Sequence, residues 1–227
     1  MPGLGRGKVV VAVALAIAVA LAAVAQAGDL GRNPANQPKL LNEPIESLDY
    51  DSARKCKKGE RPGAKALATW LASHARGELW GIYRCEKWGK HSASVHAEGR
   101  AIDWHLDAAV PKQKRGAMRL IRLLIEPDRN GEPFALARRM GVQGLIFNCR
   151  SWYGGDLGPY SACYKDNGKR DPDVDRTTAH RDHVHIELNW AGARKKTSFW
   201  KSRFAPKGGG PVSATHRVAA PERAPAP

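Results

Sequence analysis

The spacing of apolar residues predicts both helices and strands within residues 50–204. Apolar side chains recur at intervals of three and four, as on one face of a helix, over 64–74, 112–125 and 133–140. Shorter segments with strand-like alternation or a short apolar run lie at 79–85, 101–106, 144–148 and 183–188. These segments do not follow one another as a regular strand–helix repeat, so the pattern predicts an α+β domain.

The first 27 residues have the pattern of a signal peptide. Arg6 and Lys8 precede an apolar run of Val, Ala, Leu and Ile, and the small-residue sequence Ala25-Gln26-Ala27 follows it. A retained membrane anchor is the alternative, but the run is short for the roughly 20 apolar residues that span a bilayer. We therefore expect export to the cell envelope or the exterior, with cleavage after residue 27 and no stable membrane insertion afterwards.

Composition divides the rest of the chain into three parts. Residues 28–49 are rich in Asn, Pro and Gly, which predicts an extended arm. All the cysteines and tryptophans lie within 50–204, a segment long enough for one domain with its own core. Residues 205–227 are mostly Pro, Ala, Gly and basic residues, which predicts a disordered tail because they bury little apolar surface.

Four cysteines in an exported chain predict two disulfides, and four cysteines allow three pairings. We favour the pairs Cys56–Cys85 and Cys149–Cys163, because each bond closes a local loop. A cysteine-rich zinc site is the alternative. The sequence contains no Cys-x-x-Cys pair that would support it.

The formal net charge of +15 favours anionic partners. For an exported protein these are anionic cell-wall polymers or phospholipid headgroups. A solvated basic surface without a partner is the other interpretation. Nucleic acid is not expected as a partner, because the chain is exported and carries no recognisable nucleic-acid-binding motif.

Two segments about eighty residues apart concentrate histidine and carboxylate side chains. The first begins at Ser94 and has the sequence Ser-Val-His-Ala-Glu-Gly-Arg-Ala-Ile-Asp. The second begins at His180 and has the sequence His-Arg-Asp-His-Val-His. Alternate residues of a strand point the same way, so His183 and His185 are expected to project side by side. Two imidazoles on one face are costly in a core, because each has two nitrogens that need partners.

A shared metal ion accounts for these side chains. His96 and Asp103 are separated by a turn at Gly99, which lets the backbone fold back so that both side chains converge on one ion. Two histidines and one aspartate form a typical ligand set of catalytic zinc sites, with a fourth position left open.

The first segment matches the pattern Ser-x-His-x-x-Gly-x-Ala-x-Asp at every fixed position. This pattern resembles the D-alanyl-D-alanine metallopeptidases, which share their zinc site with lysostaphin-type endopeptidases and the hedgehog signalling domain. The second segment resembles the closing His-x-x-His-x-His motif of murein endopeptidases and is similar to bacterial extensin-like C-terminal domains. Together the two resemblances cover roughly residues 85–190.

The resemblance implies a fold, a cofactor and an activity. The fold would be a small antiparallel sheet with helices packed on one side, as in the hedgehog and D,D-peptidase type. The cofactor would be Zn²⁺ bound by His96, Asp103 and His185. The activity would be hydrolysis of a peptide bond in cell-wall peptidoglycan, as a D,D-carboxypeptidase or an endopeptidase.

The resemblance also suggests roles for residues near the metal. His183 is expected to act as the base, since its parity on the strand matches that of the last ligand. Asp182 is the second candidate for the base, because one branch of the family has a glutamate there. Arg84 is expected to polarise the scissile carbonyl, with a surface arginine as the alternative. Ser94 would bind substrate or cap its loop, and His180 would bind the oxyanion or orient water.

Two rival functions stay open at this level. The first is a catalytically silent, zinc-containing module that binds the cell wall. The second is a metal-free structural protein of the envelope, in which the histidines are ordinary polar residues. The metal itself is also open, because histidine and carboxylate sites accept several divalent ions.

Overall fold

A computed structural model describes residues 33–202 and residue 205 of the chain. The expected signal peptide at 1–27 lies outside the described residues, as does the tail after residue 205. Within the described part, no helix is long and apolar enough to cross a membrane.

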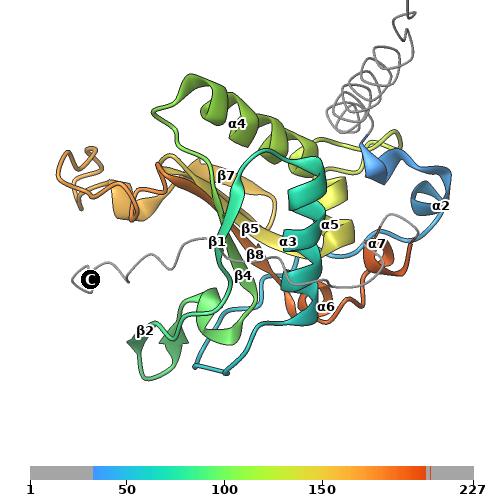
Figure 1. Cartoon of the computed structure of the whole chain (residues 1–227), viewed down its shortest axis with the longest axis horizontal. Coiled ribbons are helices and arrows are strands. Elements are labelled where there is room, and N and C mark those ends of the chain that lie inside the picture. The colour runs from blue at the N-terminus through green and yellow to red at the C-terminus, as the bar shows by residue number, and fades with distance from the viewer. Residues whose placement is uncertain (1–32, 203–204, 206–227) are drawn as a thin grey trace, which may run out of the picture. The chain divides into compact units, whose positions relative to one another are not determined.

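A six-stranded antiparallel sheet forms the centre of the fold (Figure 1). Its strand order is β1-β4-β8-β5-β6-β7. The strands are β1 (Glu78–Gly81), β4 (Ala101–His105), β5 (Val142–Phe147), β6 (Arg150–Tyr153), β7 (Asp156–Pro159) and β8 (His183–Leu188). Two further short strands, β2 (Lys87–Gly89) and β3 (Ser92–Ala93), pair separately. The expected α+β class is confirmed.

The helices cover one face of this sheet. They are α3 (Pro62–His74), α4 (Pro111–Ile125), α5 (Ala135–Met140), α6 (Trp190–Ala193) and α7 (Ser198–Lys201). Helix α3 contacts β1 and β4, α5 contacts β5, and α6 contacts β8. Figure 1 shows α3, α5, α6 and α7 to the right of the strands. On this face the Trp104 indole donates a hydrogen bond to the Arg76 carbonyl just after α3.

The strand register explains why the helices lie on that face. Ile186 of β8 pairs with Ile102 of β4 on one side and with Leu145 of β5 on the other. All three are at most 2% exposed. Directly paired residues of antiparallel strands share a face, so these side chains form a continuous apolar layer. The alternate residues of β4 and β8 carry the polar groups of the two sequence motifs.

Most predicted elements are present, with differences at their ends. The segments 64–74, 112–125 and 133–140 correspond to α3, α4 and α5, and the strands at 101–106, 144–148 and 183–188 correspond to β4, β5 and β8. Strand β1 stops at Gly81 instead of continuing to Cys85. It stops because the Ile82 carbonyl accepts a hydrogen bond from a histidine ring and Cys85 turns away into a disulfide.

The sequence pattern did not predict the strands β2, β3, β6 and β7, the helices α6 and α7, or the helices in the N-terminal arm. Strands β6 and β7 contain poor strand formers such as Asp156 and Pro159, and they pair because Gly154 and Gly155 form a turn with positive φ. The arm expected at 28–49 is also not extended throughout. From residue 33 it contains the short helices η2 (Pro34–Asn36) and α2 (Pro38–Leu41), each started by a proline.

Both favoured disulfides are present. Cys56 is bonded to Cys85 and Cys149 to Cys163, with Cα–Cα distances of 5.4 and 5.6 Å. The first bond ties the segment before α3 to the chain that follows β1. The second closes the loop that contains β6 and β7. No free cysteine is found among the described residues, so the cysteine-rich zinc site is wrong.

Candidate metal centre

Three structural elements bring the predicted ligands together. His96 lies on the short helix η3 (Val95–Glu98), Asp103 on β4, and His185 on β8. Asp103 and His185 are directly paired across the two strands, so their side chains project from the same point of the sheet. Gly99 ends η3 with φ 67°, and a Cβ there would lie 2.0 Å from the Gly59 carbonyl oxygen. Only glycine allows this turn, which returns the chain to β4.

The three ligand atoms form a tight triangle. His96 Nε2, His185 Nδ1 and Asp103 Oδ1 are each 3.0 Å from the other two. Ligand atoms at zinc–ligand distances of about 2.0–2.1 Å in a tetrahedral site lie about 3.3 Å apart. The spacing therefore fits a small ion at the centre, after a slight expansion.

In each imidazole, the nitrogen that points away from the triangle donates a hydrogen bond, and this fixes the tautomer of the ring. His96 Nδ1 donates to the Ile82 carbonyl at 2.8 Å, and His185 Nε2 donates to Glu187 Oε1 at 3.1 Å. Carbonyl and carboxylate oxygens only accept, so each ring carries its proton on the outer nitrogen. The inner nitrogens of the neutral rings and the aspartate oxygen then present three lone pairs to one point. Only a cation or an added proton relieves this arrangement.

The electrostatics of the described residues show how that proton is held without a metal. Burial lowers the pKa of His96. Burial also opposes the charged form of His185, but hydrogen bonds to Asp103 and Glu187 raise its pKa to about 9. Although burial alone would raise the pKa of Asp103, the imidazoles of His96 and His183 keep it well below its usual range. The centre is thus an anionic pocket that attracts a positive charge.

Arg84 holds the second oxygen of the aspartate ligand. Its Nη1 donates to Asp103 Oδ2 at 2.5 Å, and its Nε donates to Glu86. The substrate contact expected from the sequence stays a prediction, and the structure adds a hydrogen bond from the guanidinium to Asp103. The Arg84 side chain is still 44% exposed, so part of it is accessible to solvent beside the centre.

His183 is the most distinctive polar group beside the ligands. It is 2% exposed, and its Nδ1 donates to Asp182 Oδ1 at 2.7 Å. Its Nε2 lies 3.4 Å from Asp103 Oδ1 and has no hydrogen-bond partner among the described residues. A buried nitrogen without a partner is costly, so this lone pair has a ligand, a water or a proton to meet. Asp182 supports this ring and does not face the ligands itself.

His180 lies next to this nitrogen. It has φ 49°, its Nδ1 donates to the Thr178 carbonyl, and its ring centroid is 4.6 Å from that of His183. His180, His183 and His185 also form a group that is close enough to hold a metal. Burial, and then the neighbouring His183, lower the pKa of His180 well below its usual value. The ring is therefore neutral, and one of its nitrogens lies within 4.8 Å of a nitrogen of His183 and of one of His185.

Ser94 has a structural contact. It is 4% exposed, and its Oγ accepts a hydrogen bond from the backbone N–H of His96. Of the two roles considered from the sequence, the structure gives Ser94 the cap of η3. It thereby fixes the position of the first ligand.

Sequence reasoning missed the outer carboxylate, Glu187. Besides holding His185, Glu187 accepts hydrogen bonds from the Tyr50 hydroxyl at 3.0 Å and from Gln143 at 3.4 Å. Burial alone would raise its pKa, but the hydrogen bond from His185 lowers it. Strand parity contained a signal, because Glu187 follows His185 by two residues and so shares its face. No local sequence pattern indicated that Tyr50 and Gln143 would contact Glu187.

No protein-family model, no curated protein and no solved structure matches this chain. The family named above therefore remains a resemblance carried by the two motifs. What the structure itself contains is a His₂Asp group positioned to hold a metal ion.

Proposed function

We propose that this chain is an exported, zinc-dependent peptidase that hydrolyses a peptide bond in cell-wall peptides. One observation carries the proposal. Three lone pairs converge on one point within a triangle of 3.0 Å sides, and the buried, unpartnered Nε2 of His183 lies beside it. A ligand group with a free base next to it is the arrangement of a hydrolytic site and is not needed for a purely structural ion.

His96, Asp103 and His185 would hold the ion. Their donor set of two imidazoles and one carboxylate suits zinc, although cobalt, nickel and manganese also accept such ligands. When bound, zinc supplies Lewis acidity, which polarises a carbonyl and makes water a stronger acid.

The proton transfers fall to His183. With Nδ1–H bound to Asp182, the ring keeps Nε2 free to accept a proton from the attacking water. The same nitrogen can then return that proton to the departing amine, which must leave as a neutral group. Asp182 holds the tautomer and stabilises the imidazolium that forms between the two transfers. Its other oxygen accepts a hydrogen bond from the Thr177 hydroxyl, which fixes its position.

Two further residues would meet the substrate. Arg84 is 44% exposed and brings positive charge to the edge of the centre, where it would stabilise the negative charge that develops on the carbonyl oxygen. His180 would add a second polar nitrogen close to His183. Ser94 is buried under η3, so we do not assign it a contact with substrate.

The envelope as the location and peptidoglycan as the substrate rest on the leader and on the family resemblance. The two disulfides agree with an oxidising compartment. A basic protein would also stay close to an anionic wall, which raises the local concentration of its substrate.

The experiment that tests the proposal pairs metal content with digestion of the wall. The mature chain, a His185→Ala variant and a His91→Ala control on the exposed β2–β3 turn are dialysed and analysed for metal, then incubated with purified peptidoglycan. We expect about one zinc per chain and release of wall peptides for the wild type and for the control, and neither for His185→Ala. Zinc without release would favour the silent binding module. No metal in any of the three proteins would overturn the proposal.

A further inference from the structure

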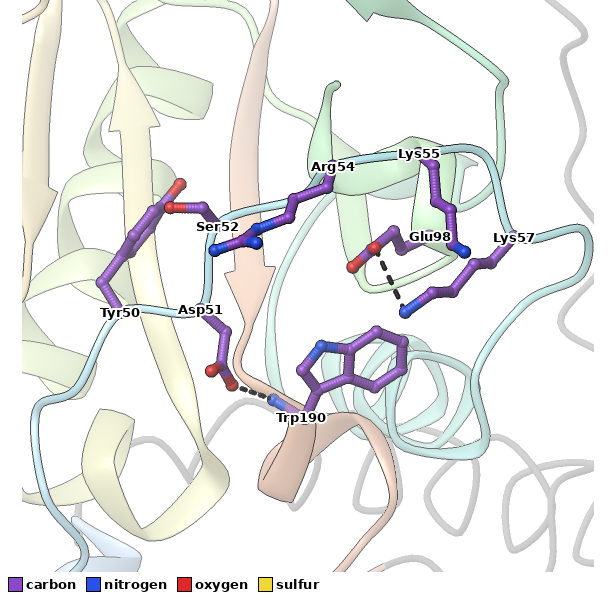
Figure 2. A pocket seen from close by; sticks show the side chains of 8 residues that line it. All are labelled: Tyr50, Asp51, Ser52, Arg54, Lys55, Lys57, Glu98 and Trp190. Atoms are coloured by element: carbon purple, nitrogen blue, oxygen red, sulfur yellow. Dashed lines mark hydrogen bonds and ion pairs between the residues drawn. The ribbon is translucent and has the colours of Figure 1, made fainter. Parts of the chain in front are cut away.

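A second region of the domain is built around Trp190. A pocket of about 380 Å³ lies here, lined among others by Tyr50, Asp51, Arg54, Lys55, Lys57 and Trp190. Figure 2 shows the indole of Trp190 on one side of this space and the segment that carries Arg54 to Lys57 on the other. None of the residues that form the His₂Asp group lines it.

The wall formed by residues 50–57 is held rigidly although it is neither helix nor strand. The backbone N–H of Asp51 donates to Gln143, and its carbonyl accepts from Gln143 and from Arg100. Cys56 is bonded to Cys85, and the Lys57 N–H donates to the Ala97 carbonyl. A segment fixed at so many points presents its side chains in a pre-formed arrangement, which lowers the entropic cost of binding.

The wall carries more cationic than anionic side chains. Arg54 and Lys55 are exposed, and neither forms an ion pair within the described residues. Lys57 lies between the Glu98 carboxylate, 3.3 Å away, and the Trp190 ring, whose centroid is 4.1 Å away. Figure 2 shows the ammonium groups of Lys55 and Lys57 on one side of the pocket and the Arg54 guanidinium toward the other.

One of the two carboxylates of the pocket is neutralised by a buried cation. Glu98 accepts two hydrogen bonds from the buried guanidinium of Arg100, in addition to its pair with Lys57. The Asp51 carboxylate accepts a hydrogen bond from the backbone N–H of Trp190 at 2.7 Å and keeps its negative charge. The lysines and the arginine that line the pocket therefore outnumber the one carboxylate without a cationic partner.

Trp190 is surrounded by cations in addition to Lys57. The guanidinium carbons of Arg100 and Arg194 lie 4.7 and 4.8 Å from its ring centroid. A cation–π contact leaves the charge of the cation in place. Arg100 is bound to Glu98 as well, whereas no carboxylate partner is found for Arg194 among the described residues.

We propose that this pocket binds an oxyanion, a phosphate or a carboxylate, carried by an anionic cell-wall polymer. Lysine ammonium and arginine guanidinium groups recognise such oxyanions. The volume admits one anionic group with part of the chain that carries it. The proposal does not depend on the peptidase activity, because no metal ligand takes part.

The test measures binding of two probes, a poly(glycerol phosphate) oligomer and an oligogalacturonate, by calorimetry at physiological ionic strength. The full mature chain is compared with an Arg54→Ala/Lys55→Ala variant. The matched control is Lys114→Ala/Arg115→Ala on α4, which removes the same two exposed charges elsewhere. Thermal unfolding and zinc content verify that each protein is folded and that the metal centre is unchanged.

We expect one saturable site, with affinity reduced about tenfold or more in the pocket variant and within twofold of wild type in the control. The probe that binds identifies the oxyanion as phosphate or carboxylate. Equal weakening in both double variants would show unspecific attraction to the basic surface and overturn the proposal. Failure of the wild type to bind either probe would overturn it as well, while leaving the metal experiment unaffected.

Discussion

The two faces of strand β8 are buried to the same degree for opposite reasons. Val184, Ile186 and Leu188 are fully buried on one face, under the helices. On the other face His183 and His185 are 2% and 5% exposed, although each ring has two polar nitrogens. The apolar face is buried because water is expelled from hydrocarbon, and any side chain of suitable shape meets that demand. The polar face is buried only because nearly every nitrogen and oxygen has a specific partner.

The exceptions on the polar face are informative. Where partners are complete, as at Glu187, the group is structural. Three lone pairs converge on one point of this face, and His183 Nε2 has no hydrogen-bond partner among the described residues, so these groups are available for binding and proton transfer. We therefore expect the apolar face to contribute most of the stability, and the polar face to govern metal binding, chemistry and the pH dependence of stability. Four experiments test this separation.

The largest effect is expected for the base. His183→Gln replaces the imidazole and so removes Nε2, the nitrogen proposed to accept the proton. We expect kcat on wall peptides to fall about 10²- to 10⁴-fold. Asp182→Asn should lower kcat less, because the imidazole is kept and only its orientation and charge partner change. Both variants should retain the metal, measured on dialysed protein. Loss of the metal from His183→Gln would show instead that His183 is a ligand.

The second largest effect is expected for a substitution on the apolar face, and it concerns the free energy of unfolding. Ile186→Ala leaves a cavity between β4, β5 and the helices, and should lower the free energy of unfolding by about 2–5 kcal/mol. Denaturant unfolding measures this change. The metal content per folded chain should stay the same at low temperature. A parallel loss of metal would mean that the two faces are not energetically separate.

The metal-free protein should be sensitive to pH. Its His185 binds a proton more tightly when folded, with a pKa of about 9 against 6.5 for an ordinary histidine. The folded state therefore holds more protons between these values, and stability should fall as the pH rises from about 6.5 to about 9. The change is on the order of 2–3 kcal/mol. The zinc-loaded protein should lack this slope, since the metal takes the place of the proton. Urea unfolding at a series of pH values compares the two forms, and identical slopes would contradict the argument.

The smallest effect is expected for the outer carboxylate. Glu187→Gln keeps the shape but removes the charge that holds His185 Nε2–H, and should weaken zinc binding about 10- to 100-fold. Competition with a chelator measures the affinity. Glu60→Gln on the exposed surface removes the same charge and should leave it unchanged. Equal affinities for all three proteins would make Glu187 a packing residue.

Much of the site could be predicted from local sequence, because strand and turn geometry act over a few residues. The parity of His183 and His185, the turn at Gly99 and the strand that carries Asp103 are all set by neighbouring residues, and each is present in the structure. The local loops closed by the disulfides followed from short separations along the chain. The amphipathic helix α4 could also be predicted from the sequence, because its apolar residues recur with the period of a helix.

Only the tertiary structure decided what lies around these groups. The Ile82 carbonyl contacts His96, and Tyr50 and Gln143 contact Glu187, so that three separate segments meet here without a local pattern that links them. The same holds for the cations around Trp190, which meet only after the chain has folded. The candidate ligands can be recognised from their residue types and their spacing along a strand or turn. Most of their hydrogen-bond partners and the shape of a pocket depend on contacts between residues far apart in sequence. The sequence by itself thus determined the three residues of the His₂Asp group, and the fold decided which nitrogen of each imidazole faces its centre and left the buried Nε2 of His183 without a hydrogen-bond partner among the described residues.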